Sequence, residues 1–297
     1  MHVFITGASG WIGSHAVQEF LTAGHRVLAL ARSDASADAL RARGAEVLRG
    51  DLDDLDALRR GADSTGGTVH LANKHDFTDP AASNAAERAA VQAIADALAG
   101  SGRPLLVASG VAGFPPGRPV AEDDVNPATG PASVRGGAEN LALGHAERGV
   151  RVLAARFAPT VHGTGDHGFV ATLVAAARAA GASRHVGDGS HRWSAVHVDD
   201  AARLVRLALE SAPAGTVLHA VAEEGVATAD IAGAIGRGLG LPVVPVEPER
   251  AVDAMGWIGA FFAMDLPASS ERTRALLGWE PQGPTLLEDL AAGGYFA

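Results

Sequence analysis

The feature that most constrains the fold is a glycine-rich segment near the start of the chain, Thr6-Gly7-Ala8-Ser9-Gly10-Trp11-Ile12-Gly13. It stands between a short apolar run, Val3–Thr6, and an amphipathic stretch, Ser14–Ala23. In a dinucleotide-binding βα unit the first glycine permits a tight turn, the second lets the backbone approach a pyrophosphate, and the third lets the helix pack on the strand. The helix N-terminus then offers free N–H groups to phosphate. We therefore predict cofactor binding by Gly7, Ser9, Gly10, Trp11, Ile12 and Gly13; the alternative is a glycine-rich turn without a ligand.

Short apolar runs alternate with amphipathic stretches through the first half of the chain. The expected strands are Val3–Thr6, Arg26–Ala31, Glu46–Leu48, Thr68–Ala72, Pro104–Ser109 and Val150–Phe157. The expected helices include Ser14–Ala23, Ser36–Arg43, Ala85–Leu98 and Ser133–Glu147. This alternation predicts an α/β fold, a Rossmann-type doubly wound parallel sheet covered on both faces.

The pattern changes after about Thr160, where helical runs are separated by Pro- and Gly-rich pieces. We expect a smaller, mainly helical C-terminal substrate lobe there. The predicted division is a nucleotide-binding domain at 1–160, to which 194–220 returns, and a substrate-binding lobe at 161–193 and 221–297.

Composition excludes several classes of function. The 297 residues include 34 Asp+Glu against 24 Lys+Arg, a net charge of −10 that disfavours nucleic-acid binding. With no cysteine there is no disulfide scaffold and no thiol nucleophile. The single lysine, Lys74, lies outside any glycine-rich loop, which excludes a P-loop and a protein kinase. We see neither a secretory signal nor a membrane span and expect a cytoplasmic protein.

The residues at the end of the second expected strand determine whether NAD(H) or NADP(H) binds. NAD-binding chains carry an acidic residue there for the ribose 2′-hydroxyl, whereas this chain has Arg32 and Ser33. A guanidinium and a hydroxyl suit a 2′-phosphate, so we predict NADP(H) over NAD(H). Asp34 is expected to cap the following helix, with a ribose contact as the alternative. After the third strand, Asp51 and Leu52 are predicted to contact adenine; Asp51 as the N-cap of a helix at 53–60 is an equal alternative.

Four further segments make the chain resemble the short-chain dehydrogenase/reductase superfamily, in its extended epimerase/dehydratase-like branch and its atypical members. They are Val69-His70-Leu71-Ala72, Arg156–Gly163, Val196–Ala202 and Leu277-Gly278-Trp279-Glu280-Pro281. The resemblance implies a Rossmann domain with a C-terminal substrate lobe. It also implies that Leu71, Ala72, Asn73 and Pro159 contact the cofactor.

The chain departs from the catalytic set that the resemblance implies, which is Ser, Tyr-x-x-x-Lys and Asn. The Tyr-x-x-x-Lys-x-x-x-Glu register falls on Pro131, Arg135 and Glu139, and the only tyrosine is Tyr295. Arg135 can hold ribose hydroxyls and place a positive charge near the nicotinamide; the alternative is an exposed helix arginine paired with Glu139. Ser109 falls at the serine position, as a substrate contact or as a strand-end serine that bonds its own backbone.

Without the tyrosine, another group must stabilise the alkoxide that hydride transfer produces. Candidates on loops after strands are Lys74, His75, His162 and His167. Lys74 as a solvated surface residue is the alternative for that side chain, and no metal is expected from His162, Asp166 and His167. We predict an NADPH-dependent reductase of a small carbonyl or imine compound, with Ser109, Arg135, Lys74 and His162 as catalytic candidates. The alternative is a non-catalytic NADP(H)-binding redox sensor.

The predicted reductase function also indicates which partners the chain binds. We expect a small-molecule substrate, no nucleic acid and no membrane. Trp193, Trp257, Phe261 and Phe262 are candidates for a substrate pocket or for the core of the lobe. Arg192 is a candidate contact for a diphosphate, although no other basic cluster lies near it in the sequence. The resemblance implies a homodimer through the expected helices Ala85–Leu98 and Ser133–Glu147.

Overall fold

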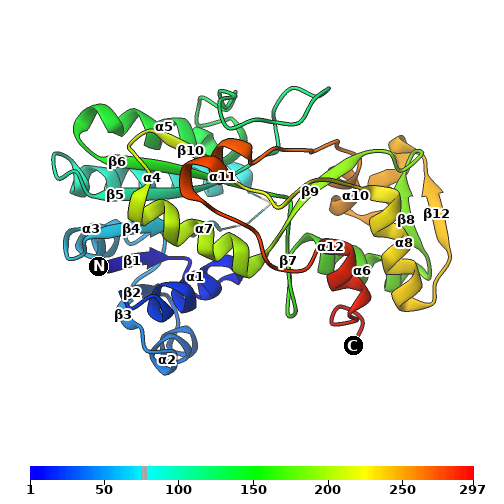
Figure 1. The fold of residues 1–297 in the computed structure, drawn as a ribbon, viewed down its shortest axis with the longest axis horizontal. Coiled ribbons are helices and arrows are strands. Elements are labelled where there is room, and N and C mark those ends of the chain that lie inside the picture. Colours follow the sequence, from blue (N-terminus) through cyan, green and yellow to red (C-terminus); the bar gives the residue numbers. More distant parts are fainter. Residues whose placement is uncertain (75, 77–78) are drawn as a thin grey trace.

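The computed structural model describes residues 1–74, 76 and 79–297, and it places a seven-stranded parallel sheet at the centre of the N-terminal part. The strand order is β10-β6-β5-β4-β1-β2-β3 (Figure 1). The strands are β1 (His2–Thr6), β2 (Arg26–Ala31), β3 (Glu46–Arg49), β4 (Gly67–His70), β5 (Pro104–Gly110), β6 (Arg151–Phe157) and β10 (Thr216–Ala220). This is the doubly wound order, with the reversal between β1 and β4, so the predicted Rossmann-type sheet is confirmed.

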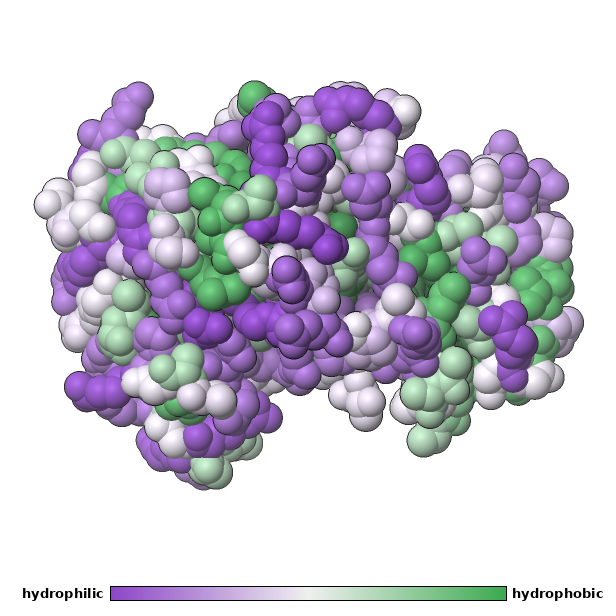
Figure 2. Space-filling view, viewed as in Figure 1, coloured by the Kyte–Doolittle hydropathy of each residue, from purple (hydrophilic) through white to green (hydrophobic). Residues whose placement is uncertain are grey.

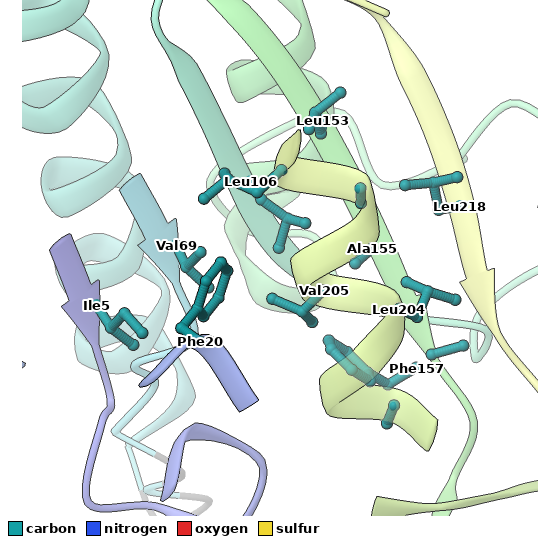
Figure 3. Close-up of a cluster of buried hydrophobic side chains, with 14 of the residues drawn as sticks. Ile5, Phe20, Val69, Leu106, Leu153, Ala155, Phe157, Leu204, Val205 and Leu218 are labelled. Atoms are coloured by element: carbon teal, nitrogen blue, oxygen red, sulfur yellow. The ribbon is translucent and has the colours of Figure 1, made fainter. Parts of the chain in front are cut away.

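Helices cover both faces of the sheet. One face carries α1 (Trp11–Thr22) and α7 (Val198–Ser211), and the other carries α3 (Leu55–Asp63), α4 (Pro80–Leu98) and α5 (Ala138–Gly144). Figure 3 shows the first of these cores, in which Leu204 and Val205 of α7 belong to the same buried cluster as Leu106 and Leu153 of the sheet. These side chains are completely buried. The continuous apolar strands of the sequence therefore bury both of their faces.

Two late segments pack against the sheet. β10 forms its outer edge beside β6. The helix α11 (Glu271–Leu277) contacts α7 and β10.

The remaining elements form a second lobe, which contains two small sheets as well as helices. The first sheet holds β7 (Thr160–His162), β9 (Arg192–His197) and β11 (Glu223–Ala227), and the second holds β8 (Ser183–Val186) and β12 (Val243–Val246). The helices of this lobe are α6 (Phe169–Ala180), α8 (Thr228–Leu239), α9 (Ala251–Met255), α10 (Trp257–Phe262) and α12 (Leu286–Ala291). Figure 1 shows this lobe beyond the carboxyl ends of the parallel strands, and Figure 2 shows hydrophobic surface at its outer end, where β12 lies.

The predicted helix Ser133–Glu147 is wrong as a continuous element. Only Ala138–Gly144 is α-helical, and the flanking Val134–Gly137 and His145–Arg148 are 3-10 turns. The physical reason is a left-handed turn: Arg135, Gly136 and Gly137 have φ of 51°, 62° and 63°. Successive left-handed residues cannot continue a right-handed helix. Within the described residues, no helix is long and apolar enough to cross a membrane.

Candidate active site

The glycine-rich segment lies where the sequence places it, between β1 and α1. Gly7 has φ of 68°, and a Cβ there would lie 2.7 Å from the Ala72 backbone nitrogen. A Cβ on Gly13 would lie 2.0 Å from the Gly7 carbonyl oxygen. No side chain caps α1 at Gly10, and Ser9 and Gly10 are exposed, so the first N–H groups of the helix face outward. The geometry fits a pyrophosphate.

Trp11 and Ile12 begin the helix and differ in their surroundings. Ile12 packs against the core of the sheet. The Trp11 indole N–H donates to the Val161 carbonyl at 2.7 Å, and its ring meets His15 and His167 edge-on. Trp11 therefore ties the glycine-rich segment to the loop that follows β7.

The end of β2 presents a guanidinium without a partner. Among the described residues, the exposed Arg32 side chain has no ion pair or hydrogen bond. Ser33, not Asp34 as predicted, is the N-cap of α2 (Asp34–Ala42), where its hydroxyl accepts from the Ser36 N–H at 3.2 Å. Asp34 begins the helix and pairs with Arg49 at 3.2 Å, because its carboxylate is better placed for that cation than for the helix N–H groups.

Asp51 does not cap the helix after β3. The N-cap of α3 is Asp54, whose carboxylate accepts from the Ala57 N–H. Asp51 instead accepts from the backbone N–H groups of Asp53 and Asp54, at 2.9 and 3.1 Å, one turn earlier. Leu52 is 9% exposed and belongs to the core on the α3–α4 face. Asp51 stays exposed, and its contact with adenine remains a prediction.

His70, at the end of β4, is buried and uncharged. Burial, together with the nearby Arg135 charge, lowers its pKa to about 3. Its Nδ1 lies 2.8 Å from the Thr6 hydroxyl, which also accepts from the Ala72 N–H at 3.3 Å. The strand ends at His70 rather than at Ala72, and Leu71 and Ala72 are half-buried beside Gly7.

The loop after β4 carries three further candidate residues, Asn73, Lys74 and His75. The Asn73 amide donates to the Glu87 carboxylate. Lys74 forms an ion pair with Asp53 at 2.8 Å on the surface, in agreement with the alternative of a solvated lysine. His75 lies outside the described residues.

Arg135 is the one non-glycine residue with positive φ among the described residues. Such a conformation costs about 1 kcal/mol or more and persists only where the surroundings impose it. Here Arg88 donates to the Gly136 carbonyl at 2.6 Å, and the Arg135 guanidinium binds the Glu87 carboxylate. The alternative of an exposed helix arginine paired with Glu139 is wrong, because the left-handed turn removes the helical i,i+4 spacing and Glu139 pairs with Arg156 instead. The side chain of Arg135 keeps 30% of its surface exposed.

Glu87 is the residue that sequence reasoning missed. It lies on α4 with 1% of its side chain exposed, and it holds Asn73 and Arg135 together. Burial raises its pKa, against the lowering effect of Arg135 and Asn73. A glutamate within the Ala-rich pattern of this helix is a signal, since a lone buried carboxylate requires a partner.

Ser109 lies near the end of β5 and is 8% exposed. Its hydroxyl faces the buried Glu139 carboxylate, which forms an ion pair with Arg156 at 2.6 Å. Burial alone would raise the pKa of Glu139, but hydrogen bonds and charge from Arg156, with help from Ser109 and Asn126, hold it below its usual value. Glu139 therefore stays ionised. Pro131 is exposed, and Pro159 is half-buried between β6 and β7.

His162 is completely buried, and its Nδ1 lies 2.9 Å from Asp289 of α12. Complete burial keeps the imidazole away from solvent and from a substrate that enters from solvent, so His162 becomes a weaker catalytic candidate. Asp166 binds the N–H of Gly168 and the hydroxyl of Tyr295, and His167 is exposed beside Trp11. The described residues contain no cluster of three or more His, Cys, Asp or Glu side chains that would hold a metal ion.

The electrostatic surroundings of Tyr295 do not suit it to replace the missing tyrosine acid. Its hydroxyl donates to Asp166 at 3.0 Å and accepts from the Gly163 N–H at 3.1 Å. Burial, followed by the Asp166 charge, raises the pKa of the phenol far above its usual value. A neighbouring cation would lower it instead.

Tyr295→Phe is therefore expected to leave kcat/KM within about twofold of wild type. It removes one hydrogen-bonded hydroxyl, which costs about 1 kcal/mol of stability. Urea unfolding and steady-state turnover of NADPH measure the two effects. Loss of turnover at unchanged stability would give Tyr295 a chemical role and contradict this assignment.

Comparisons with known proteins agree with the fold and the glycine-rich segment. The model of the NAD-dependent epimerase/dehydratase family matches residues 3–220. An uncharacterised protein of Schizosaccharomyces pombe is 40% identical over the whole of both chains. A 4-hydroxy-2-methyl-3-oxo-4-farnesyl-3,4-dihydroquinoline-1-oxide ketoreductase of Stigmatella aurantiaca is 27% identical over 73% of this chain and 67% of its own.

A solved structure extends the similarity over the C-terminal lobe. MoeE5, in complex with UDP-glucose and NAD, is 25% identical with a TM-score of 0.77, and the match covers 99% of this chain and 97% of that one. The predicted relationship to extended short-chain dehydrogenases/reductases is confirmed. This chain belongs to the NAD-dependent epimerase/dehydratase family.

Proposed function

We propose that this protein is an NADP(H)-dependent reductase of a small carbonyl or imine compound that works without a tyrosine acid. The observation that carries the proposal is Arg135, a guanidinium fixed by a left-handed turn and by Glu87 close to the end of β4. The glycine-rich segment ends β1, the neighbouring strand, so both features lie at the same edge of the sheet. Open α/β sheets bind their ligands at that edge.

The residues at this edge fit a dinucleotide. The outward N–H groups of α1 suit the pyrophosphate, and the unpaired Arg32 suits a 2′-phosphate. When bound, NADPH would supply the hydride. The residues proposed to hold it are Gly7, Ser9, Gly10, Trp11, Ile12, Gly13, Arg32, Ser33, Asp51, Leu52, Leu71, Ala72, Asn73, Arg135 and Pro159.

Arg135 is the strongest group for stabilising the developing alkoxide. Its partly exposed guanidinium keeps N–H donors beyond those used by Glu87. Ser109 faces an ionised carboxylate, so its hydroxyl must leave Glu139 before it donates to a substrate oxygen. We infer that Arg135 polarises the acceptor, that Ser109 assists, and that water delivers the final proton.

A nucleotide-sugar epimerase fits these residues less well. Epimerisation needs a base to remove a hydroxyl proton, and Pro131 stands in the register of the family tyrosine. Arg192, the candidate for a diphosphate, forms a two-point ion pair with Asp265 at 2.9 and 3.2 Å. The name of the Stigmatella ketoreductase supports carbonyl reduction as the reaction class.

The second candidate function is an NADP(H)-binding redox sensor. The observation in its favour is that Glu87 already neutralises Arg135, so the charge could serve to hold the left-handed turn alone.

NADPH consumption against ketones, aldehydes and cyclic imines separates the two functions. The reductase requires turnover with at least one class at a rate above the protein-free control. Tight NADPH binding with no turnover on any class would contradict the reductase and favour the sensor.

A further inference from the structure

Five aromatic rings in the C-terminal lobe form one continuous cluster. Phe169 is its centre, with ring centroids 5.3 Å from Phe261, 5.6 Å from Trp257 and 5.8 Å from Trp193. Trp193 in turn meets Phe262 edge-on at 5.0 Å. The rings come from α6, β9 and α10, so three separate elements converge to build the cluster.

The cluster is graded from buried to exposed. Trp193 and Phe262 are 0% and 1% exposed and belong to the core of the lobe. Phe169 and Phe261 are half-buried, and Trp257 keeps 43% of its surface exposed. Packing in the core of the lobe is a sufficient reason for the rings of Trp193 and Phe262. A large ring left partly in water against other rings offers a stacking surface.

The position of the cluster connects it with the proposed active site. Ala112, three positions after Ser109, packs against the hydrophobic core that contains Trp193 and Phe262. Phe169 begins α6 directly after the loop whose Gly163 lies against the Trp11 ring. The core that holds the buried rings of the cluster therefore contacts the segment after β5, and α6 is joined to the loop beside Trp11.

The cluster contains one unpartnered polar group. The Trp193 indole N–H is buried and has no hydrogen-bond partner among the described residues. Indole N–H groups usually find a partner when they are buried. This donor is therefore a polar position that the core of the lobe leaves unsatisfied.

We propose that Trp257, Phe261 and Phe169 select an aromatic carbonyl compound, which stacks on these rings. This inference rests on the proposed function for the reaction and adds the class of substrate. Offset or edge-on contact with aromatic rings favours a flat ring over a saturated ring of the same carbon count.

A matched pair of unreactive ligands tests the selection apart from catalysis. Benzamide and cyclohexanecarboxamide have the same carboxamide and the same number of ring carbons, and they are titrated calorimetrically into the protein with NADP⁺. The expected result is about tenfold tighter binding of benzamide, a ratio that Trp257→Ala reduces to near one. The control is Val252→Ala, which changes another exposed apolar residue of the lobe, 53% exposed, and should leave the ratio unchanged.

Turnover of benzaldehyde and cyclohexanecarbaldehyde, followed by NADPH oxidation, completes the test. Equal affinity of the two amides in wild type, or a ratio that survives both Trp257→Ala and Phe261→Ala, would overturn the aromatic selection even if both aldehydes are reduced. Discrimination between the amides with no oxidation of NADPH by any carbonyl would support the selection and overturn the reductase. Unfolding curves of each variant establish that the fold is retained.

Discussion

Arg135→Ala is expected to lower kcat/KM for NADPH-dependent reduction by at least about 100-fold. The loss of one preorganised donor to a developing oxyanion costs about 10²–10³ in rate in other enzymes. The variant also leaves Glu87 buried without its cation, so that carboxyl should take up a proton. Steady-state kinetics with NADPH and an aldehyde measure the effect.

Three companion variants separate charge from backbone strain. Arg135→Lys keeps the positive charge and should retain more activity than alanine. Arg135→Gly removes the guanidinium but relieves the strain of the 51° φ, so it should be as inactive as alanine while unfolding at higher urea concentration. Glu87→Gln in the Arg135→Ala background removes the uncompensated buried carboxylate and should recover stability without activity. Activity of Arg135→Ala within a few-fold of wild type would refute the proposed role.

Gly13→Ala is expected to weaken NADPH binding by more than about 100-fold and to destabilise the fold. The added Cβ would lie 2.0 Å from the Gly7 carbonyl oxygen, and both partners are backbone, so α1 must move away from β1. That movement displaces the N–H groups that face the pyrophosphate. Equilibrium titration and urea unfolding measure the two consequences.

Gly144→Ala provides the matched control. Gly144 ends α5 with helical φ and ψ, and nothing lies within 4 Å of an added Cβ. Alanine there should be neutral or stabilising by up to about 1 kcal/mol, with unchanged NADPH affinity. Normal cofactor affinity in Gly13→Ala would show that close approach of α1 to β1 is not needed.

The sequence predicted the sheet and its cofactor edge because both depend on local patterns. Apolar runs such as Arg26–Ala31 match β2 to the residue, and the glycine positions are imposed by contacts within a single βα unit. The helix at 133–147 failed for the opposite reason. Its periodicity is helical, but the left-handed turn at Arg135 is held by side chains of α4, which lie far away in the sequence.

The same limit applies to the candidate site. Residues on one strand end, such as Ser109, are found from their spacing along the chain. Glu87, by contrast, stands out in the sequence only as a glutamate within an Ala-rich helix, and its partners are identified only when α4 brings its carboxylate to Arg135 and Asn73. Pairings such as His162 with Asp289 join residues on β7 and α12 and are equally invisible to local patterns. The family similarity shows the fold, whereas the absence of a tyrosine acid stays a prediction that rests on the register with Pro131.

The most direct test of the account is a fluorescence titration of the purified protein with NADPH and with NADH. We predict saturable binding of NADPH that is at least about tenfold tighter than that of NADH, because Arg32 offers an unpaired guanidinium to the 2′-phosphate. In Arg32→Ala this preference should fall to near one. Tighter binding of NADH would contradict the cofactor assignment, and no affinity for either dinucleotide would remove the basis for both the reductase and the sensor.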